Sequence, residues 1–380
     1  MVDSGVIPPG DPLEIWRAKN FALRRGRQGA SRTLRAILPV AEQLDRARRE
    51  LDVDNPLNSR IALILIDNAM ELIGHRKASD VLEQDRNDRK LTPRQRADAR
   101  GRVFDTKIAF LRDQGHIPAD QVRAISIFHA YRNQLYHVGL RDDPIIGALA
   151  RRYLQLTLGL LVPLLGARRF LRWEPALVNE ASTRLLPELA IGRKYSCPVD
   201  LAALAERLAP GPAPTELAPT LRDQVLALID RSESDFAFIA KGRLGADDPV
   251  KTLVRIQLEE DTVTRFIQVR REQDKRRKAM GRPANPVDEV RLGMARGHPM
   301  LVELNAKVIP GWKPRHKKPP FASWRKRART LGANADDLLA LDAFDRLRRE
   351  MDYLDEVMAE PIYDMHGWHE HQEDMAMDRR

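Results

Sequence analysis

The chain contains one cysteine, Cys197, among 380 residues. An intramolecular disulfide and a cysteine-based zinc site are therefore excluded, and a reducing compartment such as the cytoplasm is the expected location. Aromatic residues make up only 6% of the sequence, fewer than the strand-rich core of a β-sandwich requires. Because 43% of the residues are hydrophobic and 31% are charged, the composition predicts an all-α fold with a sizeable core.

The sequence also lacks a long hydrophobic run. Its most apolar stretch, from Tyr153 to Gly166, contains Pro163 and is shorter than the ~20 residues that a membrane helix needs. The first residues show no basic stretch followed by an apolar one, so we expect neither a signal peptide nor a membrane partner. Neither glycine-rich phosphate loop, G-x-x-x-x-G-K-[ST] or G-x-G-x-x-G, is present, so no ATP or NAD cofactor is expected.

Positive charge is in excess, with a formal net charge of +10. Such an excess indicates a polyanionic partner, because lysine and arginine neutralise phosphates and release counterions. An arginine-rich composition without any such partner explains the charge equally well.

Helical periodicity and cap signals divide the first half of the chain into five segments with short connections. Such connections predict an antiparallel helical bundle. Cap-and-proline pairs start helices at Asn55-Pro56 and Thr92-Pro93. The five expected helices cover residues 31–51, 56–85, 93–115, 118–138 and 142–165.

We expect four regions along the chain. They are an N-terminal arm (1–30), the helical bundle (31–175), a helical middle region (176–300), and a last region (301–380) holding a basic and aromatic segment, a helix and an acidic, histidine-rich tail.

Arg132-Asn133-Gln134-Leu135-Tyr136-His137 lies near the end of the fourth expected helix. Residues four apart share a helix face, so Asn133 lies above His137, and His129 continues the same line. Metal-free RNA cleavage needs a group that titrates near neutrality, for which histidine is suited, and a cation that stabilises the phosphorane. An arginine fork matches phosphate oxygens, and a polar neighbour such as Asn133 or Tyr136 can orient these groups.

This stretch resembles the R-[polar]-x-x-x-H motif of the HEPN superfamily, and Ile66-Asp67-Asn68-Ala69-Met70-Glu71-Leu72 resembles the second-helix segment of that family. The resemblance covers about residues 31–170. It implies that Arg132 and His137 form the catalytic pair, that Asn133 supports them, and that an acidic residue lies close by. It further implies a homodimer with a composite cleft, metal-independent cleavage of RNA to a 2′,3′-cyclic phosphate, and a role as a toxin or antiviral-defence effector, with an antitoxin or defence-system protein as a further partner.

Two alternatives stay open for these residues. Arginine and histidine near a helix C-terminus are stabilised by the helix dipole without any catalysis. The domain would then be an inactive HEPN scaffold or a nucleic-acid-binding regulatory module.

Asp67, Glu71 and His75 form a second stripe at four-residue intervals. We expect a structural salt bridge from Asp67, while Glu71 either holds the Arg132 guanidinium or belongs to a polar seam between helices. The spacing also occurs often by chance, so no metal is expected.

A basic segment without acidic residues separates Glu303 from Asp336. Basic side chains can follow a phosphate backbone while aromatic rings stack on bases, so we expect nucleic-acid binding here. The alternative is a solvated loop whose tryptophans insert into the core. The candidate residues are Trp312, Lys313, Arg315, Lys317, Lys318, Trp324, Arg325, Lys326 and Arg327.

Overall fold

The computed structural model describes residues 37–53, 55–137, 144–172, 180–191, 196–211, 216–242, 248–281, 311–333 and 336–377. Within these ranges, the side chains of residues 136–137, 168–172, 181, 190–191, 196–198, 266 and 270 are left undescribed. Helices dominate the described chain, so the fold is all-α, as the composition predicted.

The helical residues 37–51 are followed by α2 (Pro56–Asp88), α3 (Pro93–Arg100), α4 (Phe104–Asp113), α5 (Ala119–His137), α6 (Ile146–Leu165), β1 (Arg168–Arg172), α7 (Glu180–Leu185), α8 (Glu188–Ile191), β2 (Ser196–Asp200), α9 (Leu201–Leu208), α10 (Leu217–Lys241), α11 (Pro249–Ala279), α14 (Phe321–Leu331) and α15 (Asp337–Met377). The chain forms two compact units. The N-terminal unit comprises residues 1–220 with 336–342, and the C-terminal unit comprises residues 221–335 with 343–380.

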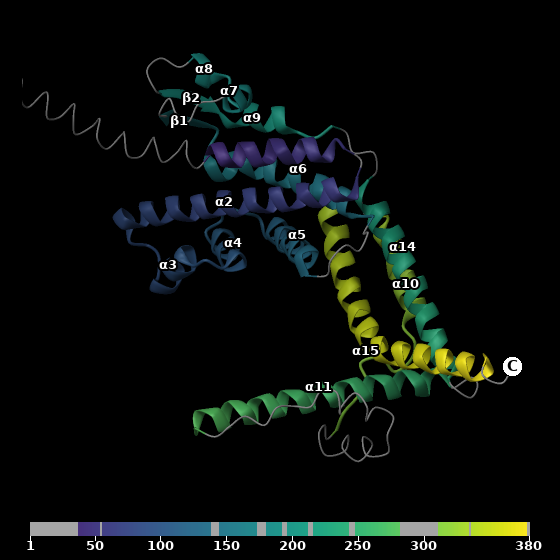
Figure 1. Ribbon diagram of the computed structural model, residues 1–380. Helices are drawn as coiled ribbons and strands as arrows, with labels where there is room; N and C mark the ends of the chain where they lie inside the picture. The colour runs from purple at the N-terminus through teal and green to yellow at the C-terminus, as the bar shows by residue number, and fades with distance from the viewer. Residues whose placement is uncertain are drawn as a thin grey trace, which may run out of the picture. The chain divides into compact units, whose positions relative to one another are not determined.

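The long helix α2 is the centre of the N-terminal unit. It packs against α6 on one side and against α3, α4 and α5 on the other (Figure 1). Its start follows the sequence prediction, since the Asn55 side chain accepts a hydrogen bond from the Leu57 backbone N–H at 2.8 Å and proline occupies the first turn. Its buried residues include Leu63, Ile66 and Met70, which join it to the core.

Helix α6 is long and apolar enough to cross a membrane by length and composition alone, but 61% of its apolar window is buried inside the structure. It packs between α2 and α9. Tyr153, Leu154 and Leu161 on this helix are 0% exposed, as in the core helix of a folded domain.

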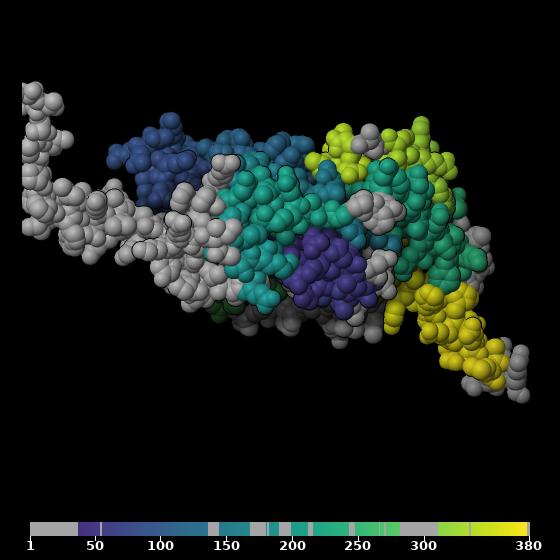
Figure 2. All heavy atoms as spheres, turned by 90° about the horizontal axis from the view of Figure 1, so that it is seen from above, coloured from purple at the N-terminus to yellow at the C-terminus, as the bar shows by residue number. Residues whose placement is uncertain are grey.

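The N-terminal unit extends beyond the expected end of the bundle near residue 175. Strands β1 and β2 pair antiparallel, with Arg168 opposite Asp200, and α9 then packs on α6. The buried residues Leu201, Leu204 and Leu208 give α9 its apolar face. The helical residues 37–51, purple in Figures 1 and 2, lie beside the teal segment that contains α7, where the Arg184 guanidinium bonds the Asp45 carboxylate.

The single helix expected over residues 93–115 is wrong, because the chain forms α3 and α4 there. The break comes at Gly101, whose ψ of 159° leaves the helical region, and Val103 is extended as well. Glycine weakens a helix through its backbone freedom, and two short helices let the chain turn back along α2.

The C-terminal unit contains α10, α11, α14 and most of α15. The Ser232 hydroxyl donates to the Asp355 carboxylate at 2.6 Å, which joins α10 to α15. The expected tail after Pro361 is helical instead, because α15 continues through this proline to Met377. His366 lies 4.9 Å from the Phe238 ring of α10, so this part of the helix has a partner.

The turn between α2 and α3 is held by the buried Asp85 carboxylate. It accepts hydrogen bonds from the Arg96 Nε and the Leu91 backbone N–H, each at 2.7 Å. The Arg96 hydrogen bond is the main reason that the pKa of Asp85 is lowered, and the Leu91 bond adds to it. Because the pKa is depressed in the folded state, the ionised Asp85 stabilises the fold above its ordinary pKa of about 4, and this contribution is lost as the pH falls through the depressed value.

We therefore expect Asp85→Asn to lower the urea midpoint at neutral pH, and the difference from wild type to shrink as the pH falls from about 5 to about 2. Asp88→Asn is the control, because Asp88 is exposed and its contact with Lys90 is 3.6 Å long. A difference for Asp85→Asn that stays constant over this pH range would contradict the assignment.

Candidate functional site

A buried carboxylate organises the site. Asp67 of α2 is 0% exposed. Its Oδ1 accepts a hydrogen bond from the Tyr153 hydroxyl at 3.0 Å, and its Oδ2 lies 2.9 Å from Nδ1 of His129. Since a carboxylate only accepts, His129 carries its proton on Nδ1. A buried charge persists only when it is paired and hydrogen-bonded, and residues of α5 and α6 meet that need.

The Arg132 guanidinium is held by side chains from two helices. Its Nε lies 3.4 Å from Oδ2 of Asp67, which bears out the expected structural salt bridge. Its Nη2 donates to Oδ1 of Asn68, and its Nη1 donates to Oδ1 of Asn133, both at 3.0 Å. The side chain remains 21% exposed. Arg132 is therefore fixed in orientation while part of it still faces solvent.

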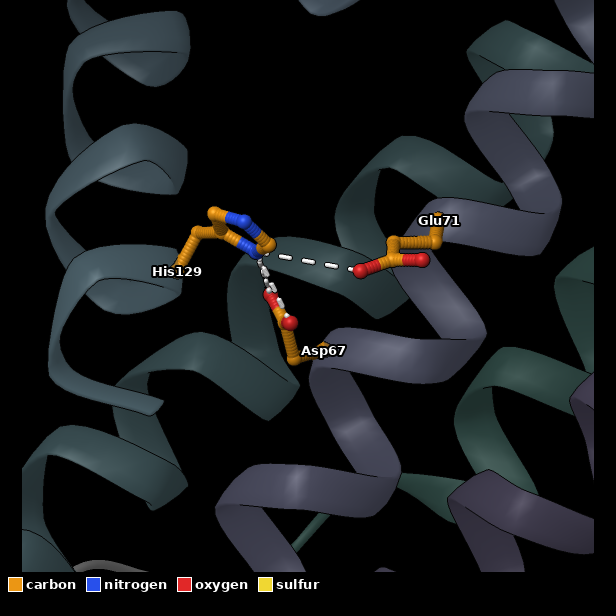
Figure 3. A group of neighbouring side chains, drawn as sticks. All are labelled: Asp67, Glu71 and His129. Carbon is orange, nitrogen blue, oxygen red and sulfur yellow. Dashed lines mark hydrogen bonds and ion pairs between the residues drawn. The ribbon is translucent and has the colours of Figure 1, made fainter. Parts of the chain in front are cut away.

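His129 lies one helical turn before Arg132 and contacts the same carboxylate. Its imidazole points toward Asp67, with Glu71 farther away (Figure 3). The hydrogen bond to Asp67 is the main cause that raises the pKa of His129, against an opposing effect of burial, and the charges of Asp67, Asp105 and Glu71 add to the rise. The Phe104 ring lies 4.6 Å from the imidazole, centroid to centroid.

Glu71 lies beside His129 in the structure, with its Oε1 3.8 Å from Nδ1. The next residue of the expected stripe, His75, points to another partner. Its Nδ1 lies 2.9 Å from Nζ of the buried Lys107 on α4. Burial lowers the pKa of both groups, and the Lys107 charge lowers that of His75 further. The three residues of the expected stripe therefore belong to two separate contacts: Asp67 and Glu71 lie beside His129, whereas His75 lies beside Lys107.

Asp67, Glu71 and His129 could also hold a metal ion, since one ligand atom from each lies within 4.8 Å of the others. A divalent ion with a preference for oxygen and imidazole suits this set. It would have to replace the His129 proton and compete with the Arg132 guanidinium at Asp67. The described cations already neutralise this carboxylate, so we assign no metal-dependent step here.

Two of the predicted site residues, Tyr136 and His137, end α5, and their side chains lie outside the described residues. The helix nevertheless continues to His137, so the backbone keeps Asn133 and His137 four residues apart on one face.

The two predicted tryptophans of the basic segment differ in burial. Trp324 of α14 is 1% exposed, and its Nε1 donates to the Glu350 carboxylate of α15 at 3.2 Å. The expected stacking of Trp324 on bases is therefore wrong, because its ring fills the core of the C-terminal unit. Trp312 is half-buried, and its Nε1 donates to the Asp261 carboxylate at 2.8 Å.

Several cations of the same segment have partners within the C-terminal unit. Arg325 bonds Asp230 at 2.7 Å and also Glu233, while Arg327 bonds Glu350 at 2.6 Å. Arg315 lies over the Tyr353 ring, 4.3 Å from its centroid. Four candidates of this segment are exposed lysines: Lys313, Lys317, Lys318 and Lys326.

Sequence reasoning missed Tyr153 and Asn68. Asn68 follows Asp67 directly, so its place beside the predicted acidic residue was the available signal. Tyr153 stood in an apolar run whose only polar signal was its own hydroxyl. Burial and the nearby Asp67 raise the pKa of Tyr153 well above its ordinary value. The hydroxyl therefore stays protonated and donates a hydrogen bond to Asp67.

No family model, curated protein or solved structure matches the chain.

Asp67→Ala should lower the free energy of unfolding by about 3 kcal/mol, because it leaves Arg132 and His129 without their buried counter-charge. Tyr153→Phe removes one hydrogen bond and should cost about 1 kcal/mol, since Asp67 keeps its other partners. Urea unfolding of both variants measures the difference. Equal costs would show that Asp67 is not the anchor of this site.

His129 should contribute stability that depends on pH. Because its pKa is raised in the folded state, its contribution is full below the unfolded value of about 6.5 and is lost as the pH rises through the raised value. The destabilisation by His129→Gln should therefore be largest in mild acid and decline at alkaline pH. His75→Gln should show the opposite trend, because the pKa of His75 is lowered. Parallel trends would contradict the assignment.

Proposed function

We propose that the chain is a HEPN-type, metal-independent endoribonuclease that acts as a cytoplasmic toxin or antiviral-defence effector. The observation that supports this best is the anchoring of Arg132 by Asp67, Asn68 and Asn133 while its side chain stays 21% exposed. A cation fixed before substrate binds needs no reorganisation in the transition state, and this is the most effective form of electrostatic catalysis.

In the proposed reaction, His137 takes the proton of a 2′-hydroxyl, and the oxygen attacks the adjacent phosphorus. Arg132 stabilises the charge on the phosphorane, and the 5′-oxygen leaves with a proton donated by a protonated His137, so the products are a 2′,3′-cyclic phosphate and a 5′-hydroxyl. Asn133 orients Arg132. His129, Glu71 and Asp67 support the pair, while Tyr136 belongs to the same helix end. Since the sequence holds one motif, we propose a homodimer that brings two motifs to one cleft.

A second candidate is an inactive scaffold or nucleic-acid-binding regulatory module. The same three contacts of Arg132 favour it, because a guanidinium that joins α2 to α5 has a sufficient structural role. The exposed lysines near residue 317 would then bind the nucleic acid. An antitoxin or another defence protein is a proposed partner in either case.

The full chain incubated with RNA in EDTA should produce fragments with 2′,3′-cyclic phosphate ends. Arg132→Ala and His137→Ala should each lower the rate by about a hundredfold or more, since a charge stabiliser and a general acid-base group each contribute that much. Arg132→Lys should stay impaired, because a point charge lacks the planar fork.

Arg112→Ala and His75→Ala are matched controls, since Arg112 pairs with Asp113 on the exposed side of α4 and His75 pairs with Lys107. Both should retain activity. RNA binding without cleavage by the wild type, unchanged in Arg132→Ala and His137→Ala, would reject the nuclease and favour the binding module. Sedimentation of the wild type tests the dimer separately.

A further inference from the structure

A pocket of about 410 Å³ lies between the end of α2 and helix α3. It is lined by Leu82, by the Asp85 carboxylate and by four guanidinium groups, those of Arg86, Arg89, Arg96 and Arg100. Arg96 already pairs with Asp85, at 2.7 Å. The remaining three arginines therefore give the pocket a strong excess of positive charge.

Arg86, Arg89 and Arg100 are exposed, and none of them has a carboxylate within ion-pair distance in the described part of the chain. Arg86 and Arg100 stand in the last turns of α2 and α3, where the helix dipole favours a cation. The dipole explains each of these two positions by itself. It does not explain why three cations from two helices and a turn line the same hollow.

Arg89 adds an independent observation. It caps α2 with φ 51° and ψ 36°, the only non-glycine residue with positive φ in the described ranges. Glycine adopts this left-handed conformation without the steric cost that a Cβ imposes and is the common residue at such a cap. A strained backbone that carries an arginine into a pocket indicates a use for the side chain.

The pocket also aligns with the Asp67–Arg132 site. Asp67 and Asp85 are 18 residues apart on α2, which is five turns at 3.6 residues per turn and about 27 Å. Asn68 and Arg86 share the same separation, as do Glu71 and Arg89. Helices α3 and α5 lie along the same side of α2 (Figure 1). A single extended strand is long enough to span the distance between the two places.

We propose that Arg86, Arg89 and Arg100 form a second phosphate-binding site, which holds the backbone of the RNA strand about 27 Å along α2 from Asp67, the residue that anchors Arg132. Guanidinium forks bind phosphate oxygens in pairs of parallel hydrogen bonds. Arg96 shapes the pocket through Asp85 and is kept from the ligand by that pairing. The assignment of the phosphate to RNA rests on the proposed function, whereas the phosphate site itself does not.

The test measures binding of the full chain to a non-cleavable, 2′-O-methylated single strand of about 12 nucleotides over a range of salt concentrations. Arg86→Gln/Arg89→Gln should weaken binding about tenfold or more and lower the salt slope by about 0.7 for each phosphate that the variant no longer neutralises. Arg94→Gln/Arg102→Gln removes the same charge from exposed arginines of this region that do not line the pocket. Binding by this control should change by less than about threefold.

Arg89→Gly separates a ligand role from a structural one. Glycine keeps the left-handed cap at lower cost, so the melting temperature should be unchanged or higher while binding weakens. Pyrophosphate, tested as a competitor, distinguishes an RNA backbone from a small phosphate ligand. If the chain binds pyrophosphate but not the RNA probe, and this binding depends on Arg86 and Arg89, the phosphate site is supported and its ligand is a small phosphate compound.

The proposal would be overturned if Arg86→Gln/Arg89→Gln bound RNA as tightly as the control variant does, and also bound pyrophosphate as tightly as the control variant does. The result is independent of the nuclease assignment, because the probe cannot be cleaved. A chain that binds through the pocket but cleaves no RNA rejects the nuclease alone. A chain that cleaves RNA but binds the probe equally well without Arg86 and Arg89 rejects the pocket alone.

Discussion

The N-terminal unit depends on one buried negative charge, the Asp67 carboxylate. A charge with no exposure is tolerated only if donors surround it, and the donors come from Tyr153 on α6 and from His129 and Arg132 on α5. A buried pair adds little net stability compared with apolar packing, since desolvation offsets the attraction. Its effect is geometric: the three helices have one arrangement in which the carboxylate is satisfied. The orientation of the Arg132 guanidinium is a consequence of that arrangement.

The helix period explains why the site gathers on one line of α5. His129 and Arg132 are three residues apart, so both reach the carboxylate of α2, and Asn133 comes beside the guanidinium as its next neighbour in the chain. On α2, Asn68 follows Asp67 and takes the other side of the same guanidinium. Two short segments thus supply both the anchor and its supports, which favours a preorganised cation over a mobile one.

The sequence predicted those parts of the fold that depend on local signals. Asn55-Pro56 placed the start of α2, and the helical middle region expected over residues 176–300 contains α10 and α11. The break between α3 and α4 was missed because an isolated glycine such as Gly101 is tolerated inside a helix, and the helix through Pro361 was missed because a proline usually ends one. The partners of Asp67 on other helices were only partly foreseen. A tyrosine in an apolar run gives no sign of which buried acceptor its hydroxyl will reach.

The distribution of charge also shows how folding reduces the positive charge that a basic segment presents. Trp324 inserts into the core, and Arg325 and Arg327 of the same helix are neutralised by Asp230, Glu233 and Glu350, which are remote in sequence. A run of cations in the sequence thus overstates how many of them the folded chain leaves without a carboxylate partner. The arginines around α3 are less conspicuous in the sequence, because Asp85 and Asp88 stand among them. Asp85 pairs with Arg96, however, and the guanidinium groups of Arg86, Arg89 and Arg100 line the solvent-open pocket. A polyanion responds to the charge that folding leaves uncompensated, and the end of α2 is one place in the described chain where three arginines without a carboxylate partner line one pocket.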